Sequence, residues 1–199
     1  MTVYLLRHGE TEWNAQRRYL GRTDLPLSSK GREELVHADF SPKTVYVSPL
    51  CRTAETAEIL FPEAERRIVV DFREMDFGAF EGRSAAEMAE DPEYRQWVDG
   101  GCVGPVPGGE SRAVFAGRTC AAFAALLDGA VTAGEDRLVI VAHGGTQMAV
   151  MERFARPRQD YYTWLGPNGG GYVLDASRWE QEGILTVLHT VQYKKGCFL

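Results

Sequence analysis

Two short segments of this chain share one pattern, a run of apolar residues that ends at a histidine followed by glycine. The first segment reads VYLLRHG and contains His8, and the second reads RLVIVAHGG and contains His143. Apolar runs of this length predict strands that are buried on both faces, as in a parallel sheet covered by helices. Open α/β sheets bind their ligands where such strands end. The pattern therefore constrains both the fold and the place of a functional site.

Predicted strands and helices alternate along the chain, which favours an α/β fold with a mostly parallel sheet. Apolar, β-branched segments predict strands at 3–6, 44–47, 68–70, 138–142, 171–175 and 185–191. Cap signals predict the starts of the helices. One helix is predicted from Ser28-Ser29 to about His37, and a second follows Ser48-Pro49 and runs through Leu60, with proline at its first position. A third begins at Ser84, with Glu87 as its capping-box partner. The last two run from Ser111 to about Gly129 and from Gly144 to Phe154.

Composition narrows the class of protein. The 199 residues, 44% of them hydrophobic, predict a single domain over 1–199 with its own core. The net charge of −6 and the absence of a Lys/Arg block argue against a nucleic-acid partner. No signal peptide and no apolar run of ~18 residues is recognised, so we expect a cytoplasmic protein with no membrane partner. Neither a disulfide framework nor a zinc site is indicated by the spacing of Cys51, Cys102, Cys120 and Cys197.

The first histidine lies in a setting that suits phosphoryl transfer. Arg7 precedes it at the end of a buried strand, where an unpaired guanidinium is costly and calls for an anion. Gly9 lets a ligand approach the backbone closely, and Thr11 and Asn14 add neutral hydrogen-bonding groups. A histidine in this position can act as a nucleophile. On its own, however, a strand-end histidine is as typical of a core with satisfied hydrogen bonds.

Other segments add charged groups of the same kind. Arg52 lies in the first turn of a predicted helix, where free backbone N–H groups already favour an anion. Glu74 follows a strand among apolar residues, where burial can raise the pKa of a carboxyl and make it a proton donor. His143 precedes the first turn of another helix. Taken one by one, Arg52 could also be a surface arginine, Glu74 a solvated loop charge and His143 a structural histidine.

Together and in this order, the segments resemble the histidine phosphatase superfamily, also called the phosphoglycerate mutase-like family. The strings that carry the resemblance are LLRHGETEWN, GRTDLPLSSKGREEL, SPLCRTAETA, FREMDFGAFEG, PGGES and VAHGG. The resemblance implies a three-layer α/β sandwich, metal-independent chemistry without a cofactor, and a small phosphorylated metabolite as substrate. It also implies site roles: His8 is the nucleophile, Glu74 the proton donor, His143 a further catalytic group, and phosphate is bound by Arg7, Asn14, Arg52 and His143.

Two details within these strings favour a phosphatase. The mutases of the family carry Arg-His where this chain has Met75-Asp76, and loss of positive charge there disfavours a second phosphate. DFGAFEG and PGGES look most like the α-ribazole phosphatase branch, which removes a 5′-phosphate in assembly of the cobalamin nucleotide loop. A broad-specificity phosphatase, a cofactor-dependent phosphoglycerate mutase and an inactive scaffold of the same fold remain alternatives.

The substrate body should contact residues outside the phosphate pocket. Segments 13–21, 100–109 and 161–164 are rich in aromatic residues and glycine, and they are expected to form the cavity walls. Direct contacts are expected from Thr11, Gly21, Glu110 and Ser111. The chain is expected to act as a monomer or homodimer.

Overall fold

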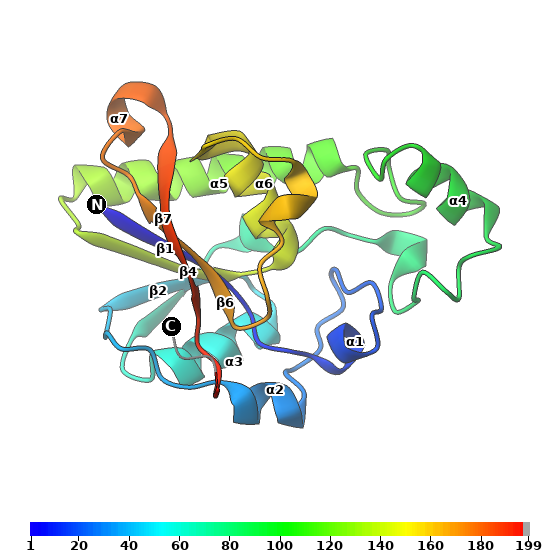
Figure 1. Cartoon of the computed structure of the whole chain (residues 1–199), viewed down its shortest axis with the longest axis horizontal. Coiled ribbons are helices and arrows are strands. Elements are labelled where there is room, and N and C mark those ends of the chain that lie inside the picture. The colour runs from blue at the N-terminus through cyan, green and yellow to red at the C-terminus, as the bar shows by residue number, and fades with distance from the viewer. Residues whose placement is uncertain (197–199) are drawn as a thin grey trace.

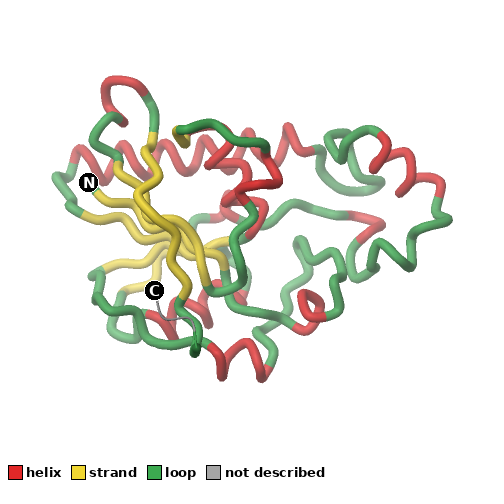
Figure 2. The backbone as a smooth tube through the Cα atoms, viewed as in Figure 1, coloured by secondary structure: helices red, strands yellow, loops and turns green. Residues whose placement is uncertain are grey.

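Seven strands form one sheet in the computed structural model of this chain, which describes residues 1–196 (Figures 1 and 2). The sheet has the order β3-β2-β4-β1-β6-β7-β5. Only β6 runs antiparallel to its neighbours, so the predicted mostly parallel α/β sheet is confirmed. The strands are β1 (Thr2–Arg7), β2 (Thr44–Val47), β3 (Glu65–Ile68), β4 (Arg137–Ala142), β5 (Ala155–Arg156), β6 (Gly170–Asp175) and β7 (Leu185–Gln192).

Helices cover both faces of this sheet, as a three-layer sandwich requires. The helices α5 (Arg112–Thr132) and α6 (Gly144–Phe154) lie on one face, and α2 (Ser29–Glu34) and α3 (Cys51–Leu60) lie on the other (Figure 1). The segment between β3 and α5 extends away from the sheet and is mostly irregular (Figure 2). The short helices are α1 (Glu12–Ala15), α4 (Pro92–Asp99) and α7 (Trp179–Glu182), with 3-10 turns at Val70–Phe72, Gly78–Phe80 and Tyr161–Trp164.

The central strands are apolar on both faces because each face is covered. Leu5 of β1 and Ile140 of β4 belong to the core beneath α5 and α6, whereas the adjacent residues Leu6 and Val141 belong to the core beneath α3. All four are fully buried. Successive strand residues point to opposite faces, and burying each such side chain contributes about 1.5–3 kcal/mol. The continuous apolar runs therefore hold the two outer layers onto one sheet.

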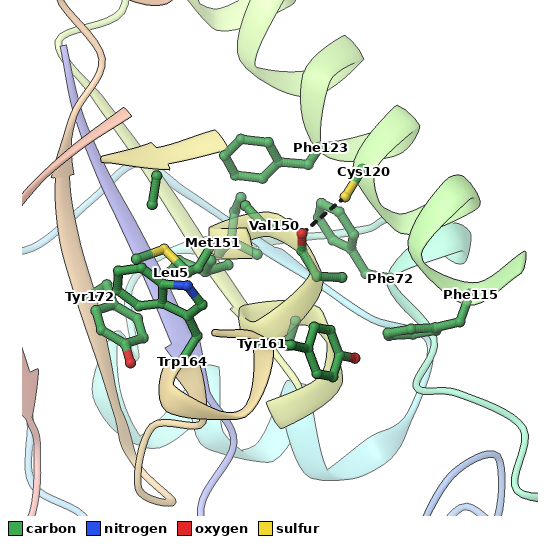
Figure 3. Packing of buried hydrophobic residues seen from close by; sticks show 14 of the residues in the cluster. Leu5, Phe72, Phe115, Cys120, Phe123, Val150, Met151, Tyr161, Trp164 and Tyr172 are labelled. Atoms are coloured by element: carbon green, nitrogen blue, oxygen red, sulfur yellow. Dashed lines mark hydrogen bonds between the residues drawn. The ribbon is translucent and has the colours of Figure 1, made fainter. Parts of the chain in front are cut away.

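The larger core joins α5 to α6 (Figure 3). Phe115 and Phe123 of α5 are fully buried, and Cys120 Sγ donates a hydrogen bond to Ala149 O of α6 at 3.4 Å. By length and composition alone, α5 is long and apolar enough to span a membrane. This differs from the sequence-based expectation that no segment comes close. Helices in the core of soluble proteins also meet these length and composition criteria. The absence of a membrane partner therefore stays a prediction.

The helix predicted at Ser84 does not form. The capping box itself is present, since Ser84 N donates to Glu87 Oε2 at 2.8 Å and Glu87 N to Ser84 Oγ at 3.3 Å. The following residues form turns, and the helix of this region, α4, begins instead at Pro92 with Asp91 as its N-cap. A residue before proline avoids the helical conformation. A helix from Ser84 would have to stop before Asp91, which leaves too few residues to sustain it.

Other predicted boundaries also need correction. Pro49 does not occupy the first helical position, because Leu50 is extended and α3 begins at Cys51. The strand predicted at 68–70 lies earlier, at β3, and it is exposed rather than buried, with Ile68 64% exposed. Its place at the edge of the sheet explains this, since only β2 lies beside it. Helix α2 ends at Glu34, short of His37.

The helices predicted from Ser111 and Gly144 are confirmed, and α5 runs to Thr132, a little past Gly129. Among the described residues, Cys51, Cys102 and Cys120 are free thiols; Cys197 lies outside the described residues.

Candidate active site

The parallel pairing of β1 with β4 brings the two strand-end histidines together. Arg7 lies opposite Ala142 in the ladder, and His8 N donates to Ala142 O at 3.0 Å. Both strands therefore end at the same level, and the rings of His8 and His143 lie with their centroids 5.3 Å apart. On the other side of β4, Ser48 follows β2 and forms a hydrogen bond of 2.8 Å with His143 Nε2. Three strand ends thus meet at one point.

The environment of His8 favours a neutral imidazole with a free Nε2. Its Nδ1 lies 2.6 Å from Gly9 O, and a carbonyl can only accept, so the ring proton is on Nδ1. Burial lowers the pKa of His8 well below its usual value, and the nearby charges of Arg52 and Arg7 lower it further. A neutral ring with its lone pair on Nε2 is the form that can attack phosphorus.

Two buried arginines supply the positive charge of the site. Arg52 is fully buried in the first turn of α3, where Nη1 donates to Thr23 O at 2.9 Å and Nη2 to Gly21 O at 2.8 Å. Arg7 Nη1 donates to Gly166 O at 2.9 Å. Burial lowers the pKa of both guanidinium groups, while the negative charge of Glu74 raises it. Backbone carbonyls therefore orient both groups without neutralising them.

Glu74 is the carboxyl group that shares this pocket. Its Oε1 accepts a hydrogen bond from Met75 N at 2.9 Å and its Oε2 from Gly145 N at 3.0 Å. Burial raises the pKa of Glu74, although these two hydrogen bonds and the charges of Arg52 and Arg7 oppose the shift. A carboxyl with a raised pKa can hold a proton and release it to a developing alkoxide.

Several nitrogen atoms of the site have no hydrogen-bond partner within residues 1–196. They are Arg7 Nε, Arg52 Nε and His143 Nδ1, and all are buried. Buried polar atoms are normally paired, and these belong to side chains at the end of β1, in the first turn of α3 and at the start of α6. An anion with several acceptor oxygens, such as a phosphoryl group, is the ligand that fits them. The described residues hold no cluster of metal-ligating side chains, and independence from metal stays a prediction.

Asn14 lies with Arg7 and His8 in the lining of a cavity. Its Oδ1 accepts hydrogen bonds from Thr11 N and Asn168 Nδ2, both at 3.2 Å. The amide nitrogen of Asn14 is therefore the group available to a ligand. Asn168 Nδ2 also lies 3.2 Å from the backbone oxygens of His8 and Gly9, so it supports the turn that carries the nucleophile. The sequence carried no motif that would have identified Asn168.

A cavity of about 340 Å³ opens beside Arg7, His8, Asn14 and Glu74, whereas Arg52 and His143 are fully buried and do not line it. Its walls come from the segments expected for the substrate body, through Tyr19, Cys102 and Tyr162, and also from the long irregular segment after β3 and from α5. Arg112, at the start of α5, lines it too, with its guanidinium carbon 4.7 Å from the ring centroid of Tyr161. Sequence reasoning missed Arg112, because nothing in its neighbourhood distinguishes it from an exposed helix-start arginine.

The structure does not place the four expected substrate contacts in the cavity lining, and each has another structural role. Thr11 caps α1, and Ser111 caps α5 by accepting a hydrogen bond from Val114 N. Gly21 supplies a carbonyl to Arg52. The carboxylate of Glu110 accepts two hydrogen bonds from Arg118. Direct substrate contacts from these four residues stay a prediction.

Gly145→Ala is expected to lower kcat/KM by about 100-fold for phosphate esters with poor leaving groups. An alanine Cβ would lie 2.1 Å from Glu74 Oε1, so the carboxyl would have to leave its position. The measurement is kcat/KM on an alkyl phosphate, with the circular dichroism spectrum to check folding. Gly117→Ala is the matched control, because a Cβ there meets nothing within 4 Å on the exposed side of α5. Unchanged activity in Gly145→Ala would contradict the role given to this glycine.

Comparisons with known proteins agree with this geometry. The model of the histidine phosphatase superfamily (branch 1) matches residues 3–186. A Salmonella typhi protein named "Probable phosphoglycerate mutase GpmB" is 38% identical over 153 residues, which cover 72% of this chain and 70% of that protein.

Two solved structures have the same fold. Phosphoglycerate mutase from Thermus thermophilus superposes with a TM-score of 0.72 at 30% identity, covering 96% of this chain and 98% of the other. The α-ribazole phosphatase from Shigella flexneri superposes with a TM-score of 0.82 at 22% identity over the whole of both chains. The chain thus belongs to the histidine phosphatase superfamily, a family of phosphatases and mutases.

Proposed function

We propose that this protein is a phosphomonoester hydrolase that forms a phosphohistidine on His8. The observation that carries the proposal is the state of His8, whose Nδ1 proton is bound by Gly9 O while the ring lies beside Arg7 and Arg52. A neutral nucleophile between two cations suits attack on a phosphate dianion. Positioning and electrostatic stabilisation supply most of the rate enhancement in such a reaction.

The first step transfers the phosphoryl group to the enzyme. His8 Nε2 attacks phosphorus, a P–N bond forms, and the P–O bond to the alcohol breaks with its electron pair going to the ester oxygen. Glu74 gives its proton to that oxygen, so the product leaves as an alcohol. Arg7, Arg52 and His143 hold the equatorial oxygens on which negative charge accumulates.

The second step returns the enzyme to its starting state. Glu74, now a carboxylate, takes a proton from a water molecule as the water oxygen attacks phosphorus. The P–N bond breaks, its electron pair returns to His8 Nε2, and inorganic phosphate leaves. One residue thus serves as acid and then as base, which needs the pKa of Glu74 to be raised toward the working pH, the direction that its burial produces.

The two residues that follow Glu74, Met75 and Asp76, favour hydrolysis over mutase activity. Met75 is buried and lines the cavity, and Asp76 pairs with Arg22 at 3.1 Å. Neither provides a positive charge for a second phosphate. A mutase must hold a bisphosphorylated intermediate, so this part of the cavity is better matched to substrates with one phosphate.

The aromatic cavity lining supports α-ribazole 5′-phosphate as the substrate. A flat base and a sugar can pack against aromatic rings, and such packing is favourable without further charge. The name of the Shigella flexneri structure gives the same substrate class, although its 22% sequence identity to this chain is evidence for a shared fold only. The aromatic residues of the lining are Tyr19, Phe77, Trp97, Phe115, Tyr161 and Tyr162.

Arg112 is the observation that favours a second candidate, a phosphoglycerate. It lines the cavity, and no carboxylate lies within ion-pair distance of it in the described part of the chain. A guanidinium in this state could bind the carboxylate of a phosphoglycerate. The names of the Salmonella typhi and Thermus thermophilus relatives point the same way.

The two candidates differ in what Arg112→Met should do. We expect kcat/KM for α-ribazole 5′-phosphate to exceed that for 3-phosphoglycerate by at least about 100-fold, or about 2.7 kcal/mol. Arg112→Met should then change kcat/KM for the ribazole ester by less than about 3-fold. Steady-state phosphate release measures both. A preference for 3-phosphoglycerate that Arg112→Met removes would establish the second candidate and leave the phosphohistidine chemistry intact.

A further inference from the structure

The general acid of the proposed mechanism lies on a segment with little regular structure. Between β3 and the turn at Gly78–Phe80, the only regular element is the 3-10 turn Val70–Phe72. Glu74 nevertheless has to meet an ester oxygen with an accuracy of a few tenths of an ångström, because small displacements of a catalytic group cost large factors in rate. Hydrogen bonds of the Glu74 side chain hold its carboxyl, and something else must hold its backbone.

Arg118 of α5 makes that contact. Its Nη1 donates to Asp71 O at 2.8 Å and to Arg73 O at 2.7 Å, and its Nη2 donates to Glu74 O at 3.1 Å. One guanidinium thus joins three carbonyl groups of the segment that ends at the acid. The Arg118 side chain is 19% exposed; its hydrogen bonds to Arg73 O and Glu74 O are partly buried, and the one to Asp71 O is exposed.

Glu110 completes the arrangement on the other side of Arg118. Its Oε1 accepts from Arg118 Nε at 2.9 Å and its Oε2 from Arg118 Nη2 at 2.8 Å, a paired geometry that fixes the guanidinium plane. Glu110 Oε2 also accepts from Asp76 N at 3.0 Å, and Glu110 N donates to Asp76 O at 2.9 Å. The backbone on both sides of Glu74 is therefore bound to one ion pair.

We propose that Arg118, oriented by Glu110, is a positioning residue for Glu74, and that it fixes the acid while adding no net charge to the site. The proposal rests on the proposed function, in which Glu74 protonates the leaving group. Arg118 does not touch the substrate, since neither it nor Glu110 lines the cavity. Its effect on the reaction must pass through the placement of Glu74.

This role predicts a dependence on the leaving group that a loss of stability does not produce. An alkoxide is strongly basic and needs the proton of Glu74, whereas p-nitrophenolate scarcely does. The ratio kcat/KM reports the steps up to phosphorylation of His8, before the water reaction that both substrates share. Misplacing the acid should lower kcat/KM for alkyl esters selectively, and a smaller folded fraction should lower both equally.

The test compares Arg118→Gln with Arg118→Lys, using p-nitrophenyl phosphate and the alkyl monoester that the wild-type enzyme hydrolyses best. For Arg118→Gln we expect kcat/KM on the alkyl ester to fall at least about 30-fold and on p-nitrophenyl phosphate less than about 3-fold. Arg118→Lys, which keeps the charge and some of the hydrogen bonds, should recover part of the loss. Leu127→Ala is the stability control, because this fully buried residue lies near the other end of α5.

Glu74→Gln, measured beside these variants, separates the possible failures. Selective loss on the alkyl ester in both Glu74→Gln and Arg118→Gln, with none in Leu127→Ala, supports the proposal. Selective loss in Glu74→Gln alone overturns the role of Arg118 and leaves the acid role of Glu74 in place. Equal losses on both esters in Arg118→Gln also overturn it, in favour of a purely structural residue. Absence of selectivity in Glu74→Gln itself overturns the acid assignment and the positioning role with it.

Discussion

Replacement of His8 by alanine is expected to lower kcat/KM at least about 1,000-fold and to abolish the covalent intermediate. His8 carries the free imidazole nitrogen beside Arg7 and Arg52, and alanine offers no nucleophile in its place. The fold should persist, because β1 keeps its ladders to both neighbouring strands. The measurement combines steady-state kinetics with trapping of a phosphoryl group that is labile to acid and stable to base.

His189→Ala is the matched control for this variant, since His189 lies exposed on β7, away from the cavity. It should retain both the activity and the trapped phosphoryl group of the wild-type protein. If His8→Ala kept more than a few per cent of the wild-type kcat, or if the phosphoryl group appeared on another residue, the nucleophile assignment would be wrong. If His8→Ala kept full activity but no phosphoryl group could be trapped, the result would indicate direct attack of water on the ester.

Glu74→Gln is expected to lower kcat/KM about 100- to 10,000-fold for alkyl phosphates and only slightly for p-nitrophenyl phosphate. Glutamine has nearly the shape of the carboxyl but cannot supply the proton. With p-nitrophenyl phosphate, the phosphohistidine should form and then accumulate, because the same residue activates water. A burst of p-nitrophenolate followed by slow turnover is the expected time course, measured by stopped flow.

The pH dependence of kcat/KM should change in a defined direction in this variant. Activity needs neutral His8, present above its lowered pKa, and protonated Glu74, present below its raised pKa. The wild-type profile on an alkyl ester should therefore be highest between these two values, and Glu74→Gln should lose the alkaline limb that Glu74 produces. Glu65→Gln serves as the control, because Glu65 is an exposed carboxylate on β3. An unchanged alkaline limb would assign that limb to another group.

Sequence reasoning was most accurate where chemistry coincides with a regular element. The strand-end positions of His8 and His143 followed from apolar runs, and the ladder between β1 and β4 confirms that they meet. It was least accurate for segments without periodicity. The Ser84–Glu87 capping box forms its hydrogen bonds, yet the proline at 92 stops any helix there. A local signal establishes local contacts only, and the length of an element depends on the residues further along the chain.

The same limit applies to charged residues outside regular elements. Glu110 is polar and follows a glycine-rich loop, which favoured a ligand contact, but its carboxylate is bound to Arg118. In the sequence, an acidic residue that pairs with an arginine on the following helix cannot be distinguished from one that binds a ligand. Arg112 presents the converse case, because a charge that faces a cavity looks in sequence like one that faces solvent.

The placement of His8 at the end of β1 has a consequence for motion. β1 is a central strand, hydrogen-bonded to β4 on one side and to β6 on the other. Amides in such a strand exchange with solvent only when the whole domain unfolds, whereas irregular segments exchange through local openings. The cavity wall beyond Glu74, through Phe77, Trp97 and Cys102, lies on a segment that is mostly irregular outside α4. That part can open and close around a substrate while His8 and the Glu74 backbone held by Arg118 stay in place, so entry and release of ligand need not disturb the geometry of phosphoryl transfer.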